Sequence, residues 1–162
     1  MKLLQSSLIK KILVILGAYA FIIFWLFLIK IGLNKLITLN FFTGIKYTAL
    51  GTFFFGCILA PLWEELVFRH APLLIAKKFK KKLKIDFTWP IVIISSVIFG
   101  WGHGFGPISI LIQGVGGLIL SFVYLKNNNS YWSAVATHFL WNFSLIYVFP
   151  SFISEYGIRV IW

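Results

Sequence analysis

The sequence has few acidic residues and almost no cysteine. Its 162 residues include four aspartates and glutamates against 15 lysines and arginines, and one cysteine, Cys57. A single cysteine excludes an intrachain disulfide. The only aspartate, Asp86, excludes a catalytic pair of aspartates. The chain also lacks Gly-x-Ser-x-Gly and His-Glu-x-x-His, which disfavours serine hydrolysis and the commonest zinc-peptidase arrangement.

Polar surface is scarce as well. Apolar residues make up 60% of the chain and the mean hydropathy is +0.93, far from the range of ordinary soluble proteins. The formal net charge of +11 would suit a nucleic-acid partner, but the lysines cluster in short segments between apolar runs, as they do in juxtamembrane loops. The composition therefore predicts an integral membrane protein whose partner is the lipid bilayer, and no nucleic acid.

Long apolar runs that do not alternate with polar residues predict an all-α fold, a polytopic transmembrane helical bundle. Only helices and closed barrels satisfy the backbone in lipid, and unalternating runs favour helices. We expect about five spans (four to six), of which the first, Ile12 to Ile29, is uncleaved. The predicted spans cover residues 12–29, 47–76, 89–104, 108–125 and 131–149.

The lysines predict how the chain is organised and oriented. We expect an N-terminal transmembrane helix and connection over residues 1–46, a helical core over 47–149 and a C-terminal tail over 150–162. With the N-terminus inside, ten basic residues fall on the inner side and four on the outer side, which favours a cytoplasmic N-terminus. Six of the eight residues from Lys77 to Lys84 are lysine. This run anchors the topology in our interpretation, with binding of anionic lipid headgroups as the alternative.

Polar and charged side chains inside the spans are the candidate site residues, because they are costly in lipid and usually face a cavity or one another. At about 1.5 Å of rise per residue, Glu64 and His103 each lie roughly 20 Å from the cytoplasmic anchors. Asn142 and His138 lie roughly 17 and 10 Å from the same surface. Three helices therefore place four polar side chains at similar depths.

Helical spacing separates the roles of these residues. Glu65 and Arg69 are four apart and can form an ion pair that lowers the cost of burying both charges. His138 and Asn142 have the same spacing and are neighbours on one helix face. Glu64 points about 100° away from Glu65, so it needs a different environment. We expect Glu64 to take part in chemistry and Glu65 with Arg69 to support it.

Three motifs contain these residues. "EELVFR" is Glu-Glu-x-x-x-Arg, "FGWGH" from Phe99 to His103 is Phe-x-x-x-His, and "HFLWN" from His138 to Asn142 is His-x-x-x-Asn. Their order and placement in apolar helices resemble the CAAX protease and bacteriocin-processing (ABI) family, which includes the type II CAAX prenyl proteases. The resemblance covers about Pro61 to Phe149.

The resemblance implies an intramembrane endopeptidase that depends on glutamate and needs no metal or other cofactor. It implies that Glu64 is the general base that activates water, assisted by His103. His138 and Asn142 would stabilise the oxyanion of the tetrahedral intermediate. The supporting residues would be Glu65, Arg69 and Phe99. The substrate would be a membrane-associated peptide or protein, and the abundance of Lys, Asn, Ile and Phe favours a prokaryotic cell membrane.

Several alternatives stay open at this point. Glu64, His103 and His138 could supply three ligands to Zn²⁺ and leave a position for water. A non-enzymatic membrane immunity or scaffold protein, of the bacteriocin self-immunity type, could use the same cavity. The two glutamates could also be structural acids that are neutralised by Arg69. His70 matches no motif position, and we assign it no role.

Overall fold

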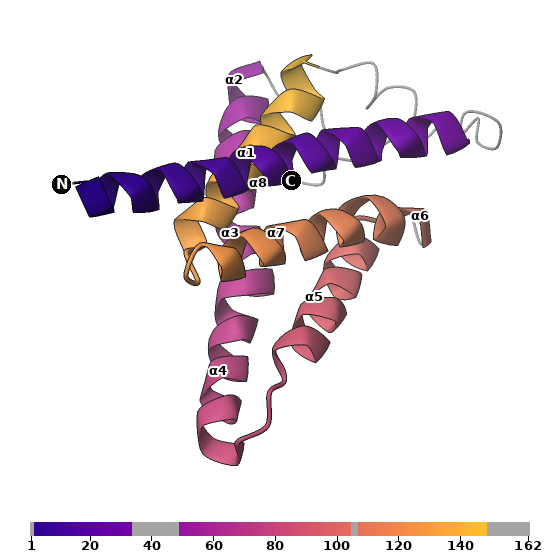
Figure 1. Ribbon diagram of the computed structural model, residues 1–162. Helices are drawn as coiled ribbons and strands as arrows, with labels where there is room; N and C mark the ends of the chain where they lie inside the picture. The colour runs from indigo at the N-terminus through magenta and orange to yellow at the C-terminus, as the bar shows by residue number, and fades with distance from the viewer. Residues whose placement is uncertain (1, 34–48, 105–106, 149–162) are drawn as a thin grey trace.

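The chain forms five helices in the computed structural model, which describes residues 2–33, 49–104 and 107–148. Every regular element in those ranges is helical, which confirms the predicted fold class (Figure 1). Segments labelled η are π-helical and join the α-helical segments beside them. The helices are α1 (Lys2–Leu33); α2 (Ala49–Thr52), η1 (Phe53–Leu59), α3 (Ala60–Glu65), η2 (Leu66–His70) and α4 (Ala71–Leu83); α5 (Thr88–Gly102); α6 (Pro107–Ser109), η3 (Ile110–Gly114) and α7 (Val115–Lys126); and α8 (Tyr131–Phe143) with η4 (Ser144–Val148).

Three of the described helices are long and apolar enough to cross a membrane: Ser7–Ile29, Leu50–Leu83 and Pro107–Lys126. Thr88–Gly102 is a shorter apolar helix. The chain is therefore an integral membrane protein. The connection expected over 34–46 and the tail expected over 150–162 lie outside the described residues.

The segments from α2 to α4 form one continuous helix, Ala49 to Leu83, which we call the long helix. Its π-helical turns precede its two prolines. One residue separates Pro61 from the end of η1, and one residue separates Pro72 from the end of η2. A proline lacks the amide donor and its ring clashes with the carbonyl four residues earlier. A local change to π-helix re-satisfies the freed backbone groups, which lets a proline remain inside a spanning helix. The helix thus stays continuous on both sides of the two glutamates.

The end of the long helix is fixed by a short capped turn. Lys84 adopts a left-handed conformation with φ of 62°, and its amide donates to the carbonyl of Lys80 over 3.1 Å. Asp86 then accepts a hydrogen bond from the backbone N–H of Thr88 over 2.9 Å and pairs with the Lys80 amine at 2.6 Å. Asp86 therefore ties the end of α4 to the start of α5.

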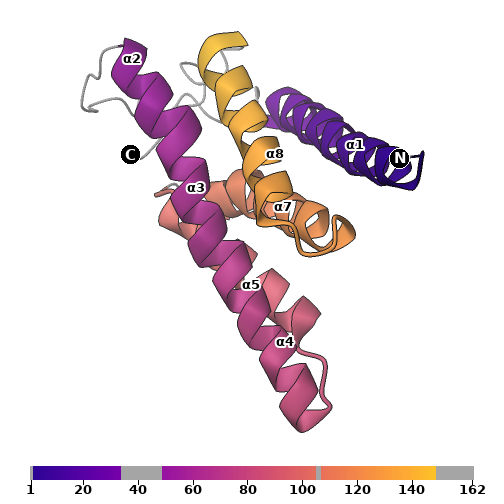
Figure 2. The ribbon, with the colours of Figure 1, turned by 90° about the vertical axis from the view of Figure 1, so that its left-hand side faces the viewer.

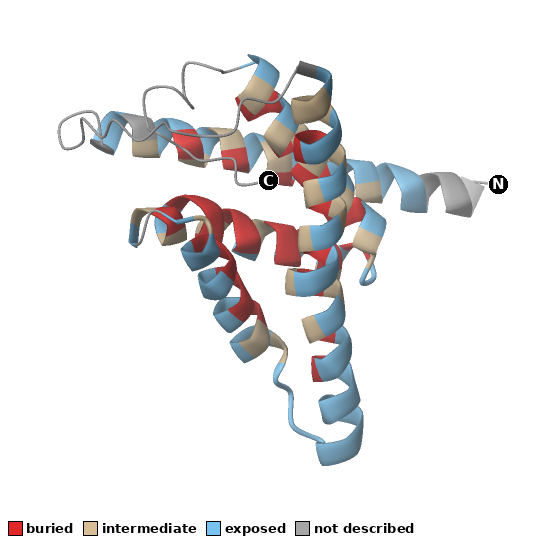
Figure 3. Ribbon diagram, turned by 180° about the vertical axis from the view of Figure 1, so that it is seen from behind, coloured by how far each residue is buried: buried red, intermediate tan, exposed pale blue. Residues whose placement is uncertain are grey.

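Small residues let the core helices approach closely. A Cβ on Gly100 of α5 would lie 2.8 Å from the amide nitrogen of Gly114 in η3, so only glycine permits this crossing. A Cβ on Gly116 of α7 would overlap the ring of Trp141 in α8. Buried residues accordingly gather on α7 and on the inner face of α5 (Figure 3).

The first helix packs on the outside of this core. Ile22 and Leu26 of α1 belong to one buried cluster with Leu120 of α7 and Trp141 of α8. The Tyr19 hydroxyl also hydrogen-bonds with that of Ser144 at 2.6 Å. Figure 2 shows α8 between the long helix and α1. This position places α8 beside the two adjacent glutamates of α3.

Candidate active site

Glu64 and Glu65 are the last two residues of α3 and lie in different surroundings. The Glu65 side chain is fully buried, whereas 16% of the Glu64 side chain is exposed. Successive helical residues differ by about 100° in direction, which explains the difference. The structure therefore separates the two carboxylates in the way that their spacing predicted.

Arg69 neutralises the buried carboxylate. Its Nη1 lies 3.1 Å from Oε1 of Glu65, one helical turn earlier, so the predicted ion pair forms. The guanidinium carbon also lies 4.1 Å from the centre of the Phe99 ring on α5. A flat cation on an aromatic face gains electrostatic attraction in addition to dispersion. Phe99 thus stabilises the position of Arg69, which in turn pairs with Glu65.

His138 of α8 lies between the two glutamates. Its Nδ1 is 2.8 Å from Oε1 of Glu65, and its Nε2 is 3.5 Å from Oε2 of Glu64. A carboxylate oxygen only accepts hydrogen bonds, so Nδ1 carries the proton and donates it to Glu65. This orients the other ring nitrogen toward Glu64. The hydrogen bond with Glu65 joins residues 73 positions apart. The sequence analysis placed His138 at a depth similar to that of the glutamates but did not predict this bond.

His103 ends α5 and is oriented by its own helix. Its Nδ1 donates to the carbonyl of Phe99 over 2.7 Å. Nε2 takes no part in this hydrogen bond. The Phe99 ring lies 4.6 Å from the His103 ring and 6.0 Å from the His138 ring, measured between centroids. Glu64 and His138 both interact electrostatically with His103. Phe99 therefore contacts three candidate residues at once.

Asn142 takes part in a different contact. Its Nδ2 donates to the backbone carbonyl of Gly56 in η1 over 3.0 Å, which ties α8 to the long helix. Within the described ranges, no hydrogen bond links Asn142 to the other candidate residues. It lies one helical turn beyond His138, as the spacing predicted, and its amide has a second N–H.

Two tyrosines that the sequence analysis did not single out contact the helix that carries the glutamates. The Tyr131 hydroxyl donates to the carbonyl of Leu62 over 2.7 Å and so fixes α3 against α8. Nδ1 of His70 lies 3.0 Å from the Tyr124 hydroxyl, and the His70 ring packs against both tyrosines. These contacts join the His70 side chain to α7 and α8. The sequence analysis assigned His70 no role, because it matches no motif position.

The site also contains buried polar atoms that lack a protein partner among the described residues. They include Oε2 of Glu65, Nε of Arg69 and Oγ of Ser96. Most buried polar atoms in proteins are hydrogen-bonded, so exceptions call for an explanation such as a functional site. The described part of the chain shows no group of three or more His, Cys, Asp or Glu side chains arranged to hold a metal ion.

Comparison with known proteins adds a family to this geometry. The family model described as "Type II CAAX prenyl endopeptidase Rce1-like" matches residues 46–144. That range contains all three motifs and the helical segments from α2 to α8. No curated protein and no solved structure matches the chain.

Proposed function

Because the chain belongs to the Rce1-like family of type II CAAX prenyl endopeptidases, we propose that it hydrolyses a peptide bond of a membrane-associated peptide or protein with water activated by Glu64. Membership of this family implies an intramembrane protease. The finer assignment of Glu64, His103, His138 and Asn142 to steps of the reaction is our proposal.

The contact of His138 with two adjacent carboxylates is the observation on which the proposal rests. A buried acid that serves only the fold needs one partner, and Arg69 already supplies it for Glu65. Glu64 is the more exposed acid and faces Nε2 of His138 at 3.5 Å. A carboxylate that is partly exposed and next to an oriented imidazole is suited to receive a proton from water.

Hydrolysis then proceeds in two steps. Glu64 takes a proton from water while the water oxygen attacks the scissile carbonyl carbon, which gives a tetrahedral intermediate with a negative oxygen. Collapse of the intermediate breaks the carbon–nitrogen bond, and Glu64 returns the proton to the leaving amine. His103, whose Nε2 is left as an acceptor by the bond to Phe99, assists Glu64 in positioning the water.

His138 and Asn142 stabilise the negative oxygen. The proton that Glu64 receives is within reach of Nε2 of His138. While the proton resides on Nε2, that nitrogen donates to the oxyanion, and the proton returns to Glu64 as the intermediate collapses. The second N–H of the Asn142 amide is the other donor. Removal of one oxyanion donor typically costs on the order of 100-fold to 1000-fold in rate. Glu65 and Arg69 hold His138 in this orientation.

The setting of the enzyme follows from the distribution of its charges. We propose a prokaryotic cell membrane with the N-terminus in the cytoplasm, since ten basic residues against four then fall on the cytoplasmic side. A cytoplasmic lysine run and a site roughly 20 Å above it suit a substrate that lies within the membrane or enters it from the surface.

Cleavage of a panel of fluorogenic peptides, prenylated and unprenylated, by the detergent-purified protein tests the proposal. We expect the wild type to cleave at least one peptide, and Glu64→Gln and His138→Ala to lose that cleavage while they remain helical. Equal turnover by all three proteins would contradict the site assignment. A non-enzymatic immunity or scaffold protein would instead keep its protective phenotype in cells that carry Glu64→Gln.

A further inference from the structure

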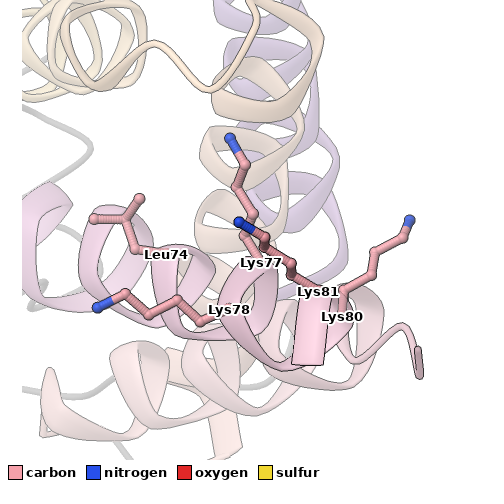
Figure 4. Close-up of a pocket in the computed structure, with 5 residues that line it drawn as sticks. All are labelled: Leu74, Lys77, Lys78, Lys80 and Lys81. Carbon is pink, nitrogen blue, oxygen red and sulfur yellow. The ribbon is translucent and has the colours of Figure 1, made fainter. Parts of the chain in front are cut away.

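The last turns of α4 carry a cationic face that packs against no other helix of the described chain. Leu74, Lys77, Lys78 and Lys81 follow the spacing of one helix face and, with Lys80, line a hollow of about 520 Å³. Figure 4 shows these five side chains around the end of the helix. We call this surface the lysine face. We propose that it binds the phosphate headgroup of an anionic phospholipid.

The opposite face of α4 accounts for its packing. Leu73 and Ala76 are buried, and Leu73 belongs to a core cluster with Val92 of α5 and Tyr124 of α7. The fold therefore needs that side of the helix, whereas the lysine face contributes no buried residue (Figure 3).

The charge of this region is almost uncompensated. The segment Lys77–Lys84 holds six lysines, and the only acid that pairs with one of them in the described ranges is Asp86, which binds Lys80. Lys77, Lys78 and Lys81 thus have no acidic partner among the described residues. Uniform positive charge so concentrated costs self-repulsion, which an anionic ligand would relieve.

The apolar floor of the hollow favours a lipid over a soluble anion. Leu74 is 42% exposed and lines the hollow together with the lysine stems. Lysine stems lie along apolar surface while their ammonium groups stay in water. The apolar run that contains Leu74 ends at Ala76, and Lys77 begins the charged run. The face therefore spans the boundary where a phospholipid phosphate meets its acyl chains.

The expected selectivity follows from the number of lysines. One lysine near an anionic membrane surface contributes about fivefold to binding, so three lysines together give on the order of 100-fold preference for an anionic headgroup over a neutral one. The preference should weaken in salt, because raising the ionic strength from about 0.1 M to about 1 M shortens the screening length from about 10 Å to about 3 Å.

Native mass spectrometry of the full chain in an equal mixture of phosphatidylglycerol and phosphatidylcholine tests the proposal. We expect the wild type to retain phosphatidylglycerol preferentially, and a variant with Lys77→Gln, Lys78→Gln and Lys81→Gln to lose the preference. Replacement of the same three lysines by arginine should preserve it.

A matched control removes the same charge elsewhere on the cytoplasmic side, with Lys10→Gln, Lys11→Gln and Lys126→Gln. This control should bind phosphatidylglycerol as the wild type does. An equal loss in the control would overturn the proposal, because net charge alone would then explain the binding. So would a wild type without preference, or thermal stabilisation by inorganic phosphate or glycerol phosphate equal to that by the lipid. The proposal does not depend on peptidase activity.

Discussion

Loss of either Glu65 or Arg69 alone should destabilise the protein far more than the intact ion pair stabilises it. Both side chains are buried, with exposures of 0% and 1%, and their charged atoms lie 3.1 Å apart. At an effective dielectric constant of about 20, two unit charges at that distance attract by about 5 kcal/mol. Most of this attraction offsets the cost of removing the charges from water. The pair therefore adds little net stability. Loss of one partner, however, leaves the other charge buried and unpaired, so that its desolvation cost is no longer offset.

A double-mutant cycle measures this coupling. We expect Arg69→Met and Glu65→Gln each to lower the free energy of unfolding by about 3–5 kcal/mol, and the double variant to cost far less than their sum, because it buries no unpaired charge. Methionine preserves contact with the Phe99 ring, and glutamine keeps an oxygen that can accept from Nδ1 of His138. Unfolding in mixed micelles, followed by circular dichroism, supplies the four stabilities. Additive costs would refute the reasoning.

Two further predictions concern packing and the turn between α4 and α5. Gly116→Ala should lower the free energy of unfolding by roughly 1–3 kcal/mol and slow cleavage, because its Cβ overlaps Trp141. Gly17→Ala, which has open space at its Cβ, should change neither the stability nor the cleavage rate. Equal melting temperatures of the two variants would contradict this prediction. The hydrogen bond from Lys80 holds the pKa of Asp86 well below its ordinary value of 3.8. The stabilisation by the carboxylate is therefore complete above that value and is lost as the pH falls toward the lower folded pKa. The stability difference between wild type and Asp86→Asn should therefore shrink below about pH 4, and a difference that grows in acid would disprove this.

The helices and the local pairs were predictable from the sequence because each depends on neighbours along the chain. Apolar runs predicted the five helices, and a spacing of four predicted the ion pair of Glu65 with Arg69. The π-helical turns before Pro61 and Pro72 were not predicted, because hydropathy does not report how a helix accommodates a missing amide.

The contacts between distant segments could not be predicted at atomic detail. Similar depth in the membrane placed His138 near the glutamates, but depth does not determine which ring nitrogen faces which carboxylate. The structure directs Nδ1 to Glu65 and Nε2 to Glu64, which makes Glu65 a partner of His138 as well as of Arg69. Asn142 was expected beside His138, and its bond to Gly56 depends on the crossing of α8 with η1.

The central claim is that Glu64 activates the water, and the single-turnover rate of peptide hydrolysis by Glu64→Gln tests it most directly. Asp86→Asn is the matched control, since it also converts a carboxylate into an amide but lies in the turn between α4 and α5. Loss of a general base typically costs 100-fold to about 10000-fold in rate. We therefore predict that Glu64→Gln hydrolyses the peptide at least about 100-fold more slowly than the wild type, while Asp86→Asn stays close to the wild-type rate. Hydrolysis by folded Glu64→Gln at the wild-type rate would contradict the account.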